Sequence, residues 1–206
     1  MTLKRLVTDL VDLGALGSGA YRIHIEPVRL RTLLEGCVEP FAPRAVAKGL
    51  SFDWGLRPGV PPLVHTDAAR LCQVLEVLLD NAVRLTSQGG VSLSVSLADP
   101  PAGAQARGVA AGAWIELVVS DTGPGMSHED QQRVLTLFQL QDRPDRSLGG
   151  GLSLPVAARW CSALGGCLRV DSDGVSGSSF IVCLPVGQPA ATESVGNPDL
   201  SPPMPA

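Results

Sequence analysis

The stretch Leu71-Cys-Gln-Val-Leu-Glu-Val-Leu-Leu-Asp-Asn-Ala-Val-Arg-Leu-Thr86 decides the fold of this chain. Its apolar residues recur at helical spacing, which predicts one helix from Asp67 to Leu85 with Asp67 as its N-cap. An apolar stripe of this kind is buried against the rest of a globular domain. The predicted buried face consists of Leu71, Leu75, Leu78, Leu79 and Ala82.

A second face of this helix carries Val77, Asn81 and Arg84, spaced four and three residues apart. The carboxamide oxygen of Asn81 is a suitable ligand for Mg²⁺, which prefers oxygen and keeps several waters. Arg84 lies one turn further along, where its charge would offset that of a phosphate. The alternative is that Asn81 makes only a local hydrogen bond, and the helix alone leaves both interpretations open.

A second segment, Val118-Val-Ser-Asp-Thr-Gly-Pro-Gly-Met126, predicts a strand that ends in a carboxylate. Gly123 and Gly125 flank a proline and allow the backbone to turn sharply beside a flat ligand. Asp121 is placed to accept a hydrogen bond from the exocyclic amine of adenine, a charged bond that contributes roughly 1.5–3 kcal/mol. An ordinary turn is the alternative interpretation.

A third segment, Ser147-Leu-Gly-Gly-Gly-Leu-Ser-Leu154, predicts a glycine-rich turn that opens a helix. Backbone N–H groups at such a helix start bind phosphate oxygens. The segment is not a P-loop, because the G-K-[S/T] ending is absent. A flexible hinge is the alternative.

The remaining elements are predicted from periodicity and from breaker residues. Pro40 and Pro43 bend or divide a helix over residues 30–48, and Pro58, Pro61 and Pro62 form a rigid loop. Ser127 and Asp130 are placed to form a capping box. Further helices are predicted over residues 3–16 and from the glycine turn to about 164, and strands over 22–26, 50–56, 91–97, 114–119, 167–171 and 178–184, the last two as a hairpin.

Composition excludes several classes of protein. The net charge of −4 at pH 7 argues against a nucleic-acid binder, which needs a basic surface to release counterions. Five cysteines without a C-x-x-C pair argue against a zinc site or a disulfide framework, and favour reduced thiols in the cytosol. No apolar run is long enough to cross a bilayer, so we expect a cytoplasmic chain without membrane contact, and leave the membrane status of its parent open.

The three segments, in this order, resemble the N, G1 and G2 boxes of histidine-kinase catalytic domains in the GHKL ATPase superfamily. The resemblance runs from about Leu3 to Pro185, and Val134-Leu-Thr-Leu-Phe138 resembles the F box of that family. It implies an α/β fold, a Bergerat-type two-layer sandwich with a mixed sheet and helices on one face. Residues 1–20 resemble the end of the second dimerisation-domain helix and its linker, residues 21–187 the ATP-binding domain, and residues 188–206 a disordered Pro/Ala-rich tail.

The resemblance also implies the ligands and partners. ATP and Mg²⁺ would be the cofactors, with Asn81 as the metal ligand and Asn81 and Arg84 as the catalytic pair. The γ-phosphoryl group would pass to a histidine in a dimerisation domain of a homodimeric parent, and then to the receiver domain of a response regulator. The nucleotide would be held by Asn81, Asp121, Gly123, Gly125, Gly149, Gly151, Leu152 and, through water, Ser178.

Departures from the family pattern keep two classes of function open. His24, His65 and His128 lack the context of the family's acceptor, so we expect no autophosphorylation of this chain alone. Val77 stands in place of a usual asparagine one helical turn before Asn81, so we expect both side chains to face the ligand. Arg84, Leu85 and Ser153 replace a lysine, an aromatic residue and a glycine of the family pattern.

Two classes of function follow from this pattern. The leading interpretation is a kinase module, and the alternative is a degenerate nucleotide-sensing interaction domain. Another type of GHKL ATPase, such as a topoisomerase, chaperone or mismatch-repair subunit, fits the helix over residues 3–16 less well.

Overall fold

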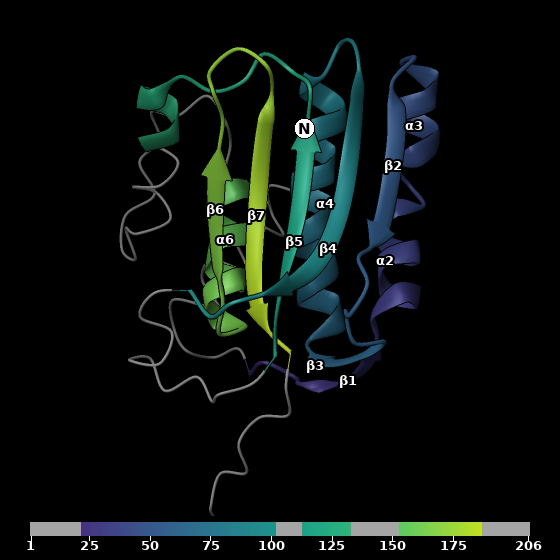
Figure 1. Ribbon diagram of the computed structural model, residues 1–206, viewed down its shortest axis with the longest axis vertical. Coiled ribbons are helices and arrows are strands. Elements are labelled where there is room, and N and C mark those ends of the chain that lie inside the picture. Colours follow the sequence, from purple (N-terminus) through teal and green to yellow (C-terminus); the bar gives the residue numbers. More distant parts are fainter. Residues whose placement is uncertain (1–21, 102–112, 133–152, 187–206) are drawn as a thin grey trace, which may run out of the picture.

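The computed structural model describes residues 22–101, 113–132 and 153–186, which form a mixed sheet with helices against one face (Figure 1). Five strands lie in the order β2-β4-β5-β7-β6. β2 runs parallel to β4, and the other neighbours are antiparallel. The predicted two-layer α/β sandwich is therefore confirmed. The strands are β2 (Ser51–Leu56), β4 (Gly90–Ala98), β5 (Trp114–Asp121), β6 (Cys167–Asp171) and β7 (Ser178–Pro185).

The helix predicted from the first segment is α4 (Ala68–Leu85), which lies at the centre of the helical layer between α2 and α6. Asp67 caps it as predicted, because its carboxylate accepts the N–H of Arg70 at 3.1 Å. The same carboxylate accepts the N–H of His24 at 3.0 Å, which attaches the incoming chain to the helix start. The apolar stripe of α4 is buried against the sheet in one continuous core.

Proline divides the preceding helix as expected. It becomes α2 (Leu30–Val38) and α3 (Ala42–Ala47), and Pro43 lies in the first turn of α3. Proline is tolerated there because the first N–H groups of a helix have no partner within it. α6 (Ser153–Ala163) and the antiparallel hairpin of β6 and β7 are also confirmed. Ser127 caps the helical residues 128–132, with its hydroxyl oxygen 3.1 Å from the backbone nitrogen of Asp130.

One expectation for the first half of the chain was wrong, and one strand was missed. The strand predicted over residues 22–26 lies instead at β1 (Glu26–Arg29), and a strand that was not predicted, β3 (Leu63–Thr66), follows the proline loop. The two pair antiparallel in a separate two-stranded sheet. Four-residue strands are too short to show alternation, and their partners lie far apart in the sequence, so the local pattern did not identify them.

Several predicted segments lie outside the described residues. They are the helix over residues 3–16, the F-box-like stretch 134–138, the glycines at 149 and 151 with Leu152, and the tail 188–206. None of the helices in the described ranges is long and apolar enough to cross a membrane.

Candidate functional site

The carboxyl end of β5 places Asp121 beside the start of β7, where it pairs with Ser178. The carboxylate of Asp121 accepts the N–H of Gly123 at 2.7 Å and also the N–H of Ser178. Burial raises the pKa of Asp121, and these two N–H groups act in the opposite direction. A half-buried carboxylate held by two backbone donors keeps a fixed orientation and still has lone pairs for a ligand.

The turn after Asp121 is closely packed on two sides. At Gly125, φ is +72°, and a Cβ there would lie 2.7 Å from the backbone nitrogen of Val175. A Cβ at Gly123 would lie 3.5 Å from the hydroxyl oxygen of Thr86, at the C-cap of α4. The turn therefore lies between the end of α4 and the loop that joins β6 to β7.

The end of α4 is fixed by a residue that the sequence analysis missed. The Lys48 ammonium donates to the carbonyl oxygens of Val83 at 2.7 Å, Arg84 at 3.1 Å and Thr86 at 2.7 Å. The last carbonyls of a helix lack partners within it and carry a partial negative charge, so a cation stabilises them. The available signal was compositional, because Lys4 and Lys48 are the chain's lysines.

Thr122 was also missed, and it fixes the turn to the segment that follows α4. Its hydroxyl donates to the carbonyl of Gln88 at 2.8 Å and accepts the N–H of Gly90 at 2.9 Å. The hydroxyl of Thr86 donates to the carbonyl of Ala82 at 2.7 Å inside the same corner. These bonds join the end of α4, the start of β4 and the end of β5 into one rigid corner.

On the polar face of α4, the Arg84 guanidinium donates to the Asn81 carboxamide oxygen at 2.6 Å. The local hydrogen bond left open by the sequence is therefore present. The guanidinium would repel a metal ion at this oxygen, since both are cations.

Val77 is buried one helical turn before Asn81, and the expectation that both side chains would face a ligand was wrong. Its side chain is 3% exposed and belongs to the hydrophobic core, whereas Asn81 is only half-buried. The helix is rotated so that position 77 falls inside the apolar stripe and position 81 falls at its margin. A valine at position 77 is therefore explained by packing.

Val77→Asn should lower the free energy of unfolding by roughly 1–3 kcal/mol, the cost of burying an amide without a matched partner. Val46→Asn is the matched control, because Val46 is a helical valine that is 68% exposed. Urea unfolding followed by circular dichroism measures both variants. Equal, small losses would place Val77 at the ligand surface after all.

The structure thus brings together Asp121, Gly123, Gly125 and Ser178, with Asn81 and Arg84 near the end of the adjoining helix. In the described ranges, no group of three or more His, Cys, Asp or Glu residues could hold a metal ion. This donor set fits a Mg²⁺ ion bound mainly by phosphate and water oxygens, with one carboxamide from the protein.

Comparison with known proteins gives a consistent result. A family model described as "Histidine kinase-, DNA gyrase B-, and HSP90-like ATPase" matches residues 66–188. The chain is 30% identical over 181 residues to the adaptive-response sensory kinase SasA of Synechococcus sp. (strain JA-3-3Ab), covering 88% of this chain and 45% of SasA. It is 30% identical over 187 residues to the sensor protein GacS of Pseudomonas syringae pv. syringae, covering 88% of this chain and 19% of GacS. The chain therefore spans less than half the length of these curated relatives.

Solved structures agree. Full-length ShkA, crystallised in complex with AMPPNP, superposes with a TM-score of 0.72 at 30% identity, covering 91% of this chain and 36% of ShkA. The mycobacterial sensor histidine kinase MprB superposes with a TM-score of 0.59 at 26% identity, covering 81% of this chain.

Proposed function

Since this chain belongs to the family of histidine kinase-, DNA gyrase B- and HSP90-like ATPases, we propose that it is the ATP-binding catalytic domain of a sensor histidine kinase. The observation that carries this proposal is the corner at Asp121. A half-buried carboxylate there is oriented by two backbone N–H groups and lies against the end of the helix that bears Asn81. Such a carboxylate is suited to accept the amine of adenine.

In this proposal each group of residues binds a different part of the nucleotide. Asp121 and, through water, Ser178 bind the adenine end, and Gly123 and Gly125 form the tight turn beside it. Asn81 would hold Mg²⁺, which offsets phosphate charge when bound. The triphosphate would be bound by backbone groups of Gly149, Gly151 and Leu152.

Arg84 has a specific part in this arrangement. Its guanidinium holds the Asn81 oxygen at 2.6 Å, and a bound triphosphate offers it a stronger, doubly hydrogen-bonded partner. We propose that nucleotide binding transfers Arg84 from Asn81 to phosphate, which frees the carboxamide oxygen for the metal. Phosphoryl transfer depends mainly on such positioning and on charge stabilisation.

Calorimetric titration of the chain with Mg·ADP and Mg·GDP tests nucleotide binding directly. Guanine carries a carbonyl oxygen where adenine carries the amine, so it would face the Asp121 carboxylate with an acceptor. Saturable binding of ADP with at least tenfold preference over GDP is expected, roughly 1.4 kcal/mol. Equal affinities, or no binding, would contradict the proposed site.

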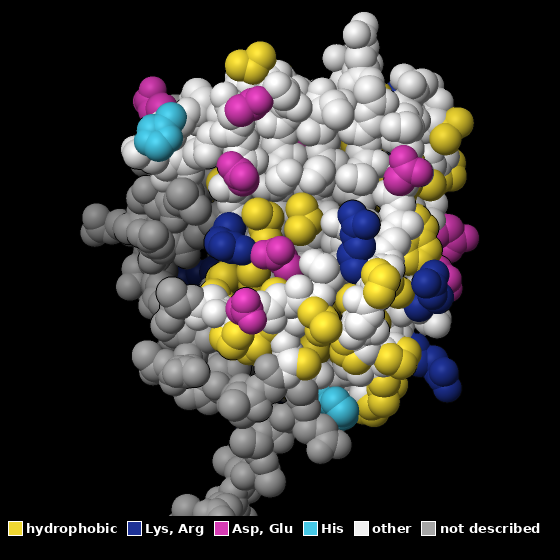
Figure 2. Space-filling model, viewed as in Figure 1, with side chains coloured by type: hydrophobic (Ala, Val, Ile, Leu, Met, Phe, Trp, Pro, Cys, Tyr) yellow, Lys and Arg dark blue, Asp and Glu magenta, His cyan; other side chains and the backbone are white. Residues whose placement is uncertain are grey.

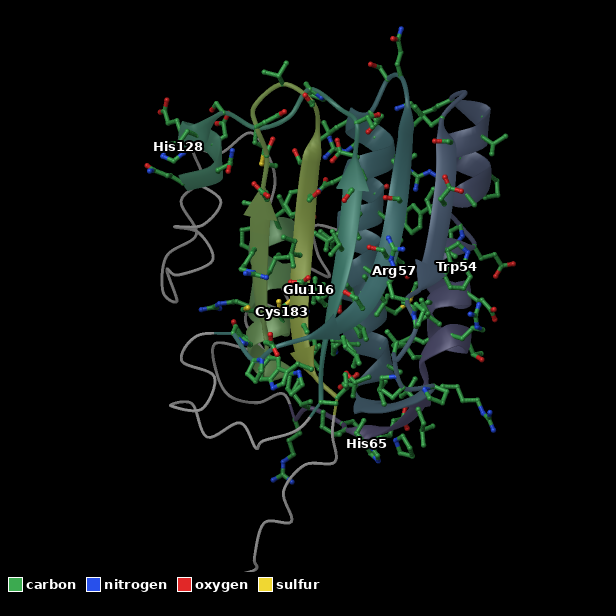
Figure 3. All side chains as sticks on the ribbon, in the orientation of Figure 1. Trp54, Arg57, His65, Glu116, His128 and Cys183 are labelled. Atoms are coloured by element: carbon green, nitrogen blue, oxygen red, sulfur yellow. The ribbon has the colours of Figure 1, made fainter. Side chains whose placement is uncertain are left out.

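The chain alone should not form phosphohistidine. His65 lies at the opposite end of the sheet from the carboxyl end of β5 (Figure 3), and β1 with its neighbour His24 pairs there with β3. With γ-labelled ATP, acid-labile label is expected only on a dimerisation domain of a relative supplied in trans, and not on one lacking its acceptor histidine. Stoichiometric labelling of His24, His65 or His128 would contradict this.

The second candidate function is a degenerate domain that senses nucleotide without transferring phosphate. The Arg84–Asn81 hydrogen bond favours it, since it reduces the oxygen available to a metal. Retained ADP binding without transfer to any supplied acceptor is the result that would select this alternative.

A further inference from the structure

The face of the sheet opposite the helices carries two cysteines directly across from each other. Cys167 on β6 pairs with Cys183 on β7, and Cys183 pairs on its other side with Glu116 on β5. The three residues therefore form one row across three strands. Figure 3 shows Glu116 and Cys183 together on this face, and Figure 2 shows hydrophobic and charged side chains mixed in its middle.

The backbone of the paired strands holds the two cysteines at a separation that suits a disulfide. Directly paired residues of antiparallel strands have Cα atoms about 4.5–5.5 Å apart. This separation lies within the range of roughly 4.4–6.8 Å that disulfides span. The side chains of Cys183 and Cys167 are also within hydrogen-bonding reach of each other, so the two sulfurs lie close together.

A cation and a carboxylate adjoin the pair. The Arg169 guanidinium lies 3.5 Å from the Cys183 sulfur and donates to Glu116 at 2.7 Å. The Cys183 thiol in turn lies 3.6 Å from the same Glu116 oxygen. A guanidinium stabilises a neighbouring thiolate, which is the reactive form of cysteine.

We propose that Cys167 and Cys183 are a dithiol site for a two-electron oxidant of the peroxide class, which joins them as a disulfide across β6 and β7. The site lies on the face of the sheet away from the helices and is independent of the nucleotide function proposed above.

The exposure of the two thiols sets the order of the steps. Cys167 is half-buried on an edge strand, whereas Cys183 is 2% exposed. The hydrogen bond to Cys167 and burial raise the pKa of the Cys183 thiol, so Cys183 keeps its proton while the more exposed Cys167 meets the oxidant. Cys167 is therefore the first nucleophile.

The chemistry balances with peroxide as the oxidant. The Cys167 thiolate attacks one peroxide oxygen, the O–O bond breaks, and the departing oxygen leaves as water after protonation. The resulting sulfenic acid of Cys167 is then attacked by the Cys183 sulfur, whose proton leaves with the hydroxyl group as a second water. Two thiols and one peroxide give one disulfide and two waters, and Arg169 stabilises the Cys183 sulfur as its proton departs.

A second thiol pair in the same chain serves as the internal comparison. Cys37 on α2 donates to Cys72 on α4, which lowers the pKa of Cys72. Cys37 is fully buried in the core, and the group beside Cys72 is the Glu76 carboxylate at 3.8 Å, which disfavours a thiolate. We therefore expect the Cys37–Cys72 pair to remain reduced when the cross-strand pair oxidises.

The test begins with the reduced, full-length chain and an equimolar amount of hydrogen peroxide. After alkylation and tryptic digestion, mass spectrometry should find a crosslink between the peptide of Cys167 and that of Cys183, with the loss of two hydrogen atoms. Fragment ions separate Cys167 from Cys161, which shares its peptide. A crosslink between Cys37 and Cys72 instead, or only alkylated cysteines, would overturn the proposal.

Variants test the assigned roles separately. Cys183→Ser should leave Cys167 as a sulfenic acid that dimedone labels, and Cys167→Ser should leave Cys183 unlabelled. Arg169→Met should slow crosslinking of the otherwise wild-type chain severalfold, while the far-UV circular dichroism stays unchanged. Dimedone labelling of Cys183 in Cys167→Ser, at the rate seen for Cys167, would overturn the order of the steps.

Discussion

Asp121→Asn should weaken binding of Mg·ADP at least tenfold, roughly 1.4 kcal/mol. The variant preserves the shape of the side chain but replaces a charged acceptor with an amide, and its NH₂ group repels the adenine amine if it turns toward it. The N–H groups of Gly123 and Ser178 already occupy part of the carboxylate, so an asparagine oxygen cannot serve both them and the ligand equally. Calorimetric titration of both proteins measures the difference.

The same variant has a pH signature that separates binding from folding. Burial raises the pKa of Asp121, so the folded protein takes up this proton at a higher pH than the unfolded chain. The contribution of Asp121 to the free energy of unfolding is therefore full below the pKa of the unfolded chain, about 3.9. It is lost as the pH rises through the higher pKa of the folded protein, and it stays lost at higher pH. At neutral pH the unliganded variant should accordingly be no less stable than the wild type. ADP affinity of the wild type should fall as pH drops through the raised pKa, and that of Asp121→Asn should not.

Asp53→Asn is the matched control, because Asp53 is an exposed carboxylate on β2. It should bind ADP as the wild type does. If Asp121→Asn binds equally well, Asp121 is not in the site. If it loses affinity only in proportion to lost stability, the role of Asp121 is structural.

Gly177→Ala should destabilise the domain by at least about 3 kcal/mol or prevent its folding. The residue has φ of +113°, a region that side chains rarely adopt. A Cβ there would overlap the backbone oxygen of Asp121, which is part of the β5–β7 ladder and cannot move alone. The strain therefore falls on the strand end that positions Asp121.

Gly36→Ala is the matched control, and it should stabilise the domain where Gly177→Ala destabilises it. Gly36 lies within α2, and nothing approaches a Cβ built on it within 4 Å. Alanine stabilises a helix interior by roughly 0.5–1 kcal/mol relative to glycine. Thermal unfolding of both variants measures the contrast. A Gly177→Ala protein as stable as the wild type would show that the corner at Asp121 adapts.

The features of the fold that the sequence predicted correctly depend on residues that lie close together in the chain. The apolar period and the N-cap of α4, the division of the preceding helix by proline and the end of β5 at Asp121 all follow from local rules, and the structure confirms each. The register of β5 and β7 places Asp121 opposite Ser178, and their joint role in binding a ligand stays a prediction.

What the sequence did not predict depends on contacts between distant segments. β1 and β3 acquire their structure from each other, across more than thirty intervening residues. Val77 and Asn81 share a helix face by spacing, yet the margin of the core falls between them, and only the position of the sheet decides where. Likewise, the cross-strand row of Cys167, Cys183 and Glu116 exists only once three strands are in register.

The end of α4 departs from the chain's general use of arginine. This chain uses arginine for nearly all of its positive charge, yet it has a lysine where three carbonyl oxygens converge. An ammonium presents three donors around one small centre, whereas a guanidinium spreads its donors along a flat fork. The usual exchange of one cation for the other is therefore not neutral at position 48. The arrangement of the donors, and not the charge alone, suits lysine to this position.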